Sequence, residues 1–160
     1  SILFSWELIY VHSHERTIPM DHITKEQRSK IMSSIKAKSQ LEDTVTKELW
    51  RRGIRFRRNV RSLYGTPDIA IKKYKIVIFI DSCFWHCCPE HFRMPKSNLE
   101  YWEKKFEMNK KHDAEVTAYY REQGWIILRF WEHEIKLNLD KVIDKLEMVI
   151  KQAKLQHQQK

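Results

Sequence analysis

The sequence predicts a single α/β domain in which helices flank a mixed central β-sheet. Its 160 residues are enough for one hydrophobic core but not for two domains. Apolar residues at helical spacing alternate along the chain with short strand-like runs, in the order α-α-β-β-β-α-β-α. No run approaches the roughly 18 consecutive apolar residues that a membrane span needs.

The first two elements are predicted to be helices. Thr24 and Gln27 have the spacing of a capping box, which predicts a basic amphipathic helix over residues 24–37. Ser39 and Glu42 repeat that spacing. A second, separate helix is therefore expected from residue 39 onwards.

Three strands and a long loop are expected next. Gly53 should end the second helix, and residues 54–59 alternate apolar and basic side chains, which is typical of an edge strand. Residues 68–71 and 75–80 flank a basic turn and predict a hairpin. The second of these strands is almost entirely apolar, so we place it in the centre of the sheet. Residues 82–96 show neither helical nor strand periodicity and are expected to form an ordered loop.

The last third of the sequence predicts a helix, a strand and a helix. Ser97 and Glu100 have capping-box spacing at the start of a long helix, which Gly124 should end. The run 125–131 (WIILRFW) predicts a buried strand, and an amphipathic helix is expected from about Asp140.

The charge favours a polyanionic partner. Thirty Lys and Arg residues against 21 Asp and Glu give a net charge of +9, which indicates nucleic acid first and anionic lipid second. A solvated basic surface is the simpler alternative. We interpret Met20 as the natural start, residues 1–19 as a leader outside the fold, residues 20–155 as one domain and residues 156–160 as a frayed tail.

The cysteines indicate a metal rather than disulfide bonds. All three lie within six residues, too close together to staple a fold, which also indicates a reducing, cytoplasmic compartment. Four ligands of the kind that tetrahedral zinc accepts are expected to form a structural site: Cys83, Cys88, His91 and His133. Cys87 and His112 are the reserve ligands. The alternative is that the cysteines are buried apolar residues and the histidines lie on the surface.

Two carboxylates at strand ends suggest a second metal. Asp68 opens one predicted strand and Asp81 follows the end of the next. Hard oxygen ligands in such a position can hold Mg²⁺. Because Pro-Asp is also a common turn dipeptide, Asp68 as a turn cap is the alternative.

The loop also contains Phe84, Trp85 and His86. Exposed aromatic residues in a basic protein suit stacking on bases, although packing in the core is a rival explanation. A histidine next to a metal site suits the activation of water. One face of the following helix is formed by residues at spacings of four, three and four: Trp102, Phe106, Asn109 and Asp113. Asp113 could therefore orient His86, or simply form an ion pair.

Taken together, the segments TKEQRSKIMSSIKAK, GIRFR, TPDIAI, VIFIDSCFWHCCPEH, YWEKKFEMNKKHD and GWIILRFWEHE resemble the very short patch repair (Vsr) endonucleases. The resemblance extends from Met20 to about Ile150. It implies a restriction-endonuclease-like fold, a structural zinc and a Mg²⁺-dependent activity that nicks one DNA strand beside a T:G mismatch.

The resemblance also implies roles for individual residues. Asp68 matches the metal-binding aspartate, His86 the catalytic histidine, Asp113 its companion, and Glu42 an acidic residue that approaches the site. Three aromatic residues match those that intercalate beside the mismatch: Phe84, Trp85 and Trp102. The proposed zinc ligands match the four zinc positions of the family.

Two departures from the family pattern affect the metal site. Ile80 replaces a threonine whose backbone carbonyl helps to bind the metal, so the carbonyl is retained. Asp81 replaces a histidine and could add a second carboxylate ligand. The lysine that restriction-type nucleases place just after this acidic position is missing, because Ser82 and Cys83 follow Asp81.

These observations predict metal-assisted phosphodiester hydrolysis that leaves 5′-phosphate and 3′-hydroxyl ends at a nick. The expected partner is double-stranded DNA, bound by a monomer. The resemblance adds mismatch-repair proteins and a cytosine-5 methyltransferase as possible associates. Two alternatives stay open: a restriction-type or phage-encoded endonuclease, and a zinc-stabilised DNA-binding module without catalysis.

Overall fold

The computed structural model describes residues 8–9, 18–19 and 23–160. The predicted start at Met20 lies outside these residues. Within the predicted leader, β1 (Leu8–Ile9) and β2 (Ile18–Pro19) form an antiparallel pair. None of the helices in the described part of the chain is long and apolar enough to cross a membrane.

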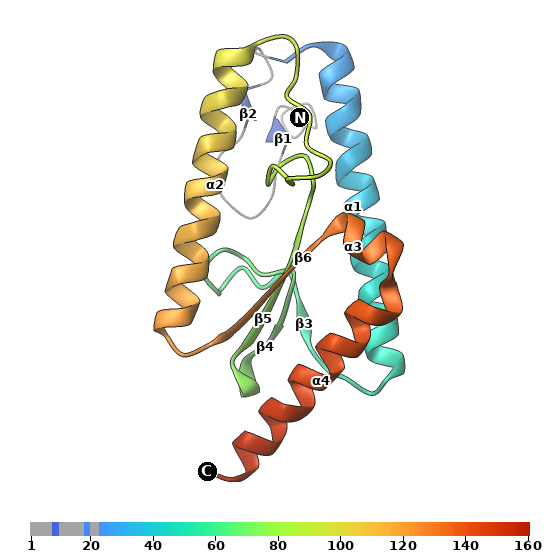
Figure 1. Ribbon diagram of the computed structural model, residues 1–160, viewed down its shortest axis with the longest axis vertical. Coiled ribbons are helices and arrows are strands. Elements are labelled where there is room, and N and C mark those ends of the chain that lie inside the picture. The colour runs from blue at the N-terminus through green and yellow to red at the C-terminus, as the bar shows by residue number, and fades with distance from the viewer. Residues whose placement is uncertain (1–7, 10–17, 20–22) are drawn as a thin grey trace, which may run out of the picture.

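A four-stranded mixed sheet forms the centre of the molecule, as predicted (Figure 1). Its order is β3 (Arg57–Arg58), β4 (Ile69–Ile71), β5 (Ile76–Asp81) and β6 (Ile126–Trp131). The pairs β3–β4 and β4–β5 are antiparallel, whereas β5 and β6 are parallel. The predicted edge strand is confirmed, although β3 has only two residues.

Burial differs between the two apolar strands. All six residues of β5 are buried, which confirms its central place. In β6 only Phe130 is buried and the other residues are half-buried, so this strand is less buried than the sequence predicts. The reason is topological, because β6 is the outer strand of the sheet and pairs only with β5.

The two predicted N-terminal helices are one 27-residue helix, α1 (Lys25–Arg51). The Thr24 capping box is confirmed, since the Gln27 backbone N–H donates to Thr24 Oγ1 at 3.1 Å and the Thr24 N–H donates to Gln27 Oε1 at 3.0 Å. The second box is wrong. Ser39 lies inside the helix, and because no proline or glycine interrupts the chain there, nothing ends the first helix.

The helix α2 (Leu99–Glu122) ends before Gly124, whose φ of +72° confirms the predicted C-terminal glycine. The predicted capping box at its start is wrong, because the N-cap is Asn98 in a left-handed conformation. The Ser97 hydroxyl instead accepts a hydrogen bond from Gln27 Nε2 at 3.0 Å. This bond joins the beginnings of α1 and α2.

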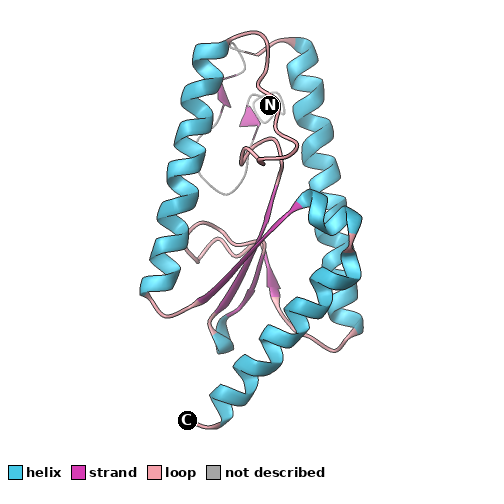
Figure 2. Ribbon diagram, viewed as in Figure 1, coloured by secondary structure: helices cyan, strands magenta, loops and turns pink. Residues whose placement is uncertain are grey.

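Helices cover both faces of the sheet (Figure 2). A short helix α3 (Glu132–Leu137) precedes α4 (Leu139–Gln158), and both pack with α1 on one face. The other face is covered by α2. A turn of 3-10 helix, η2 (Lys72–Tyr74), joins β4 to β5. Since α4 continues to Gln158, the helix extends beyond the predicted end of the domain at residue 155.

The N-terminal halves of α1 and α2 extend beyond the sheet, with the loop after β5 between them (Figure 1). A separate apolar cluster fills this region, and its buried members are Ile31, Trp85, Trp102 and Phe106. The loop is therefore held by packing on both helices as well as by the sheet.

Candidate active site

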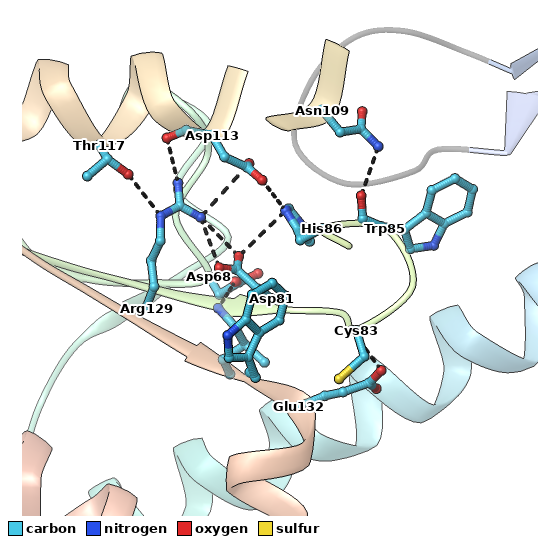
Figure 3. A network of polar contacts seen from close by, with 12 residues as sticks. Asp68, Asp81, Cys83, Trp85, His86, Asn109, Asp113, Thr117, Arg129 and Glu132 are labelled. Carbon is cyan, nitrogen blue, oxygen red and sulfur yellow. Dashed lines mark hydrogen bonds and ion pairs between the residues drawn. The ribbon is translucent and has the colours of Figure 1, made fainter. Parts of the chain in front are cut away.

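Polar side chains from the sheet, the loop and two helices converge at the end of the sheet where β5 leads into the loop (Figure 3). They include four residues proposed from the sequence: Asp68, Asp81, His86 and Asp113. The loop residues 82–88 turn back beside α2, because Asn109 Nδ2 donates to the Trp85 carbonyl at 3.1 Å. This places His86 next to the strand ends.

Asp68 lies immediately before β4 and is almost fully buried, with 4% of its surface exposed. Its Oδ2 accepts a hydrogen bond from the Ile80 backbone N–H at 2.7 Å, so Asp68 adjoins the strand residue whose carbonyl was expected at the metal site. The Nζ atom of Lys38 lies 3.4 Å from Asp68 Oδ1 and 3.5 Å from Glu42 Oε1. An acidic pair thus surrounds one cationic group.

Glu42 extends from α1 towards Asp68 and Lys38, so it approaches the site as the family resemblance implies. Burial is the main cause that raises the pKa of Glu42 to about 7, and the negative charge of Asp68 adds to it, against the opposing effect of Lys38. Two carboxyl groups held this close in a buried site favour a bound cation.

Asp81 contacts an arginine and the catalytic histidine candidate. Both of its carboxylate oxygens lie near Arg129 Nη1, at 3.0 and 3.2 Å. Its Oδ1 is also 3.8 Å from His86 Nδ1. Asp81 therefore faces the histidine side of the site, in contact with an arginine.

His86 and Asp113 form the pair predicted from the sequence. His86 Nδ1 lies 2.5 Å from Asp113 Oδ2, and the imidazole side chain is 11% exposed. A carboxylate at this ring nitrogen favours the tautomer with the proton on Nδ1. Proton transfer to or from a substrate would then involve Nε2.

The four predicted zinc ligands come together beside this site. The ligand atoms of Cys83, Cys88, His91 and His133 all lie within 4.8 Å of one another. The Nδ1 atom of His133 is 3.3 Å from Cys83 Sγ and 3.5 Å from Cys88 Sγ, and His91 Nδ1 is 3.8 Å from Cys88 Sγ. Ligands of a tetrahedral zinc are separated by roughly 3.3–3.8 Å, so these three distances match that geometry.

Neighbouring groups support the cluster, and the reserve ligands lie outside it. The Cys83 backbone N–H donates to Glu132 Oε1 at 2.9 Å. Burial raises the pKa of the Cys83 thiol to about 12, so a bound cation would be needed to favour its thiolate form. Of the reserve ligands, Cys87 packs against the separate apolar cluster that contains Trp85 and Trp102. The ring of His112 contacts the Tyr64 ring, with 5.8 Å between their centroids.

The structure distinguishes between the two explanations for the aromatic residues. Trp85 and Trp102 are buried, with 4% and 0% of their surfaces exposed, so for Trp85 the rival explanation, packing in the core, is the one that the structure favours. Ile31 packs against them from α1, a contact between distant segments that the sequence does not reveal. Phe84 is partly exposed and, with Lys30 and other residues, lines a cavity of about 790 Å³ between α1 and the loop.

Sequence reasoning missed Lys38 and Arg129. Arg129 had a detectable signal, since it is the one charged residue in the apolar run 125–131. A charged residue in such a strand usually has a specific partner. Lys38 had no signal, because it is one of several basic residues in a basic helix.

The sequence is also similar to those of known proteins. The sequence model of the family described as DNA mismatch endonuclease Vsr matches residues 20–90. The chain is 38% identical over 135 residues to the type II nicking enzyme V.NmeDIP of Neisseria meningitidis serogroup C, covering 82% of this chain and 91% of that protein.

Two further relatives place the chain in the same group. It is 43% identical to the type II nicking enzyme V.HpaIIP of Haemophilus parainfluenzae, over 76% of this chain and 89% of that protein. It is 34% identical to the DNA mismatch endonuclease Vsr of Escherichia coli K12, over 68% of this chain and 70% of that protein. With the convergence of acidic residues and a histidine at the end of a mixed sheet, these similarities show that the chain belongs to the Vsr family and is a DNA endonuclease.

Proposed function

We propose that this endonuclease nicks one strand of duplex DNA beside a T:G mismatch, in a Mg²⁺-dependent reaction on a restriction-endonuclease-like scaffold. The observation that most supports it is the His86–Asp113 pair next to the buried Asp68 and Glu42. This arrangement offers a base for water and an oxygen-rich cation site within one cluster. The products would be a 5′-phosphate and a 3′-hydroxyl.

The residues around Asp68 fit a hard divalent cation. The carboxylates of Asp68 and Glu42 already enclose the ammonium group of Lys38, so this position attracts positive charge. Asp68, Glu42 and the Ile80 carbonyl would hold Mg²⁺, which supplies polarisation of the scissile phosphate and stabilisation of the leaving 3′ oxygen. Asp81 is left out of this ligand set, because Arg129 contacts both of its carboxylate oxygens.

The chain itself supplies the proton transfer. Asp113 fixes the imidazole of His86 through Nδ1, and Nε2 would take a proton from the attacking water. The carboxylate would also stabilise the imidazolium that forms. Because His86 is largely buried, bulk water would compete little for this hydrogen bond.

We further propose that the Cys83, Cys88, His91 and His133 cluster binds a structural zinc. All four donors are protein side chains of the types that closed zinc sites use, which leaves no position for a reacting water. The cluster joins the loop to the beginning of α3 through His133. Zinc would therefore fix the loop that presents His86.

For DNA binding, we propose that basic residues contact phosphates and that aromatic residues enter the stack at the mismatch. Phe84 is the most exposed of the three predicted aromatic residues, so it would make the first contact with bases. Trp85 and Trp102 would pack against Phe84 inside the protein. Direct contact of these two residues with bases would require the N-terminal half of α1 to move away. Unstacking costs a few kcal/mol and is cheapest at a mismatch, which gives selectivity.

A strand-resolved cleavage assay tests this function. Two duplexes that differ only in one T:G mismatch are incubated with the protein in Mg²⁺, with EDTA as the metal control. Nicking of the T strand of the mismatched duplex alone, lost in His86→Ala, is expected. A matched control is His157→Ala, because His157 lies at the end of α4 and should be dispensable.

Each other outcome would contradict part of the proposal. Equal cleavage of the matched duplex, or cuts in both strands, would favour a restriction-type endonuclease. Cleavage that persists in EDTA would exclude the metal-dependent mechanism. Full activity of His86→Ala would remove the histidine from catalysis.

A further inference from the structure

We infer that Arg129 is a positioning residue for the catalytic imidazole and that Asp81 acts as its partner rather than as a metal ligand. The inference rests on the proposed nicking activity. Arg129 lies on β6, outside the segments that contain the other proposed catalytic groups. Its guanidinium reaches the two carboxylates that face His86 Nδ1 (Figure 3).

Four hydrogen bonds and a ring contact fix the direction of this side chain. Nη1 binds both oxygens of Asp81, at 3.0 and 3.2 Å. On α2, Nε donates to Thr117 Oγ1 at 3.1 Å and Nη2 to the Asp113 carbonyl at 3.4 Å. The guanidinium carbon also lies 4.5 Å from the centroid of the Phe79 ring, a distance that suits a cation–π contact. A planar guanidinium with several donors suits this role better than an ammonium group would.

The charges explain why a cation is needed there. Asp113 Oδ2 and Asp81 Oδ1 lie 2.5 and 3.8 Å from the same nitrogen of His86. Two carboxylates that face one N–H compete for it and repel each other. Arg129 Nη1 is 3.0 Å from Asp81 and 3.9 Å from Asp113 Oδ1, so it stands between them. With Asp81 accepting from Arg129, the imidazole N–H is left to Asp113.

This role differs from that of an ordinary ion pair between a strand and a helix. An ion pair that only attached α2 to the sheet would not need to lie next to His86. Arg52 provides the comparison, because it is similarly buried and binds Asp144 and Glu147 of α4, in another part of the molecule. The substitution Arg52→Gln therefore removes an arginine of the same kind without touching the proposed site.

The test compares Arg129→Gln, Arg129→Lys, Asp81→Asn and the double variant Asp81→Asn/Arg129→Gln with Arg52→Gln. Nicking of the mismatched duplex gives kcat, and a gel-shift measurement gives the Kd for DNA. The far-downfield proton resonance of the imidazole N–H, assigned by its loss in His86→Ala, reports the His86–Asp113 contact without any substrate.

Arg129→Gln should lower kcat by about 100-fold, the order of loss that misplacement of a catalytic group by 1 Å produces. Its Kd should stay within about threefold, and the downfield resonance should broaden or vanish. Arg129→Lys should recover part of kcat. The double variant should be at least about tenfold faster than Arg129→Gln, because it removes the competing carboxylate charge. Arg52→Gln should change only the melting temperature.

Two results would overturn the inference: an Arg129→Gln enzyme with unchanged kcat and resonance, or a double variant slower than Arg129→Gln. The second would return Asp81 to the metal site. Should the unmodified protein fail to nick any duplex, the proposed function fails, whereas the resonance still tests the role of Arg129. If Arg129→Gln does not fold, Arg129→Lys supplies the same two readouts.

Discussion

Replacing Glu42 with glutamine is expected to stabilise the folded protein at pH 8 while it impairs nicking. The pKa of this carboxyl group is raised from 4.5 to about 7 in the folded protein. At pH 8 the group must be ionised in a site that favours its neutral form. By linkage, a shift of that size corresponds to about 3 kcal/mol of lost stability, because each pKa unit is worth about 1.4 kcal/mol.

The pH dependence gives the sign of the effect. A group with a raised pKa binds its proton more tightly in the folded state, so its stability contribution is lost as pH rises from 4.5 to about 7. At pH 5 the folded group is protonated, and the ionisation cost falls to about 1 kcal/mol or less. Glutamine resembles the protonated form at both pH values. The gain from Glu42→Gln should therefore be larger at pH 8 than at pH 5.

Urea unfolding of both proteins at the two pH values measures this difference. The matched control is Glu48→Gln on the same helix, because hydrogen bonds to Arg51 and Arg52 lower the pKa of Glu48 to about 2. That substitution should destabilise the protein by nearly the same amount at pH 8 and pH 5, because the contribution of a group with a lowered pKa is lost only as pH falls below 4.5. Equal effects of Glu42→Gln at pH 5 and pH 8, or destabilisation at pH 8, would refute the reasoning about the acidic pair.

Four further outcomes are expected. Cys88→Ser should lower both the zinc content, measured by atomic emission, and the melting temperature; a protein that contains no zinc before the substitution would contradict the metal assignment. Trp102→Ala should cost about 3–5 kcal/mol in urea unfolding, the usual range for a fully buried tryptophan. Gly65→Ala should destabilise the fold, because the residue has φ +74° and an added Cβ would lie 2.8 Å from Val116; an unchanged unfolding midpoint would contradict this. In a gel-shift titration, the logarithm of the Kd for DNA should rise linearly with the logarithm of the salt concentration, and a salt-independent Kd would exclude phosphate contacts.

The proposed site residues were accessible to sequence reasoning where the chemistry lies in short local motifs. The cysteine and histidine spacing predicted the four side chains that the structure brings together, because His133 lies just past the end of a strand parallel to the one before Cys83. The pairing of His86 with Asp113 followed from helical spacing along α2. These inferences needed only periodicity and the rule that strand ends of one sheet lie together.

The errors have a common physical origin. Capping-box spacing predicts a helix start at Ser39, which lies inside α1, and a Ser97 cap on α2, which begins nearby without that cap. Such spacing is only one local preference, and tertiary contacts decide whether it is used. The burial of Trp85 and Trp102 depends on α1 packing beside the loop. No local pattern reports such a contact between distant segments.

The sequence by itself determined the mixed α/β domain, the order of the four strands of its central sheet, the four clustered Cys and His side chains and the family resemblance. Local periodicity and motif spacing contain that information. Only the tertiary structure decided that Lys38 lies between Asp68 and Glu42 and that Arg129 contacts Asp81 beside His86. Burial makes an unpaired charge costly, so each of these buried charges needs a partner. Which residue becomes the partner depends on how α1, β5 and β6 pack against one another, and local sequence patterns do not contain that information.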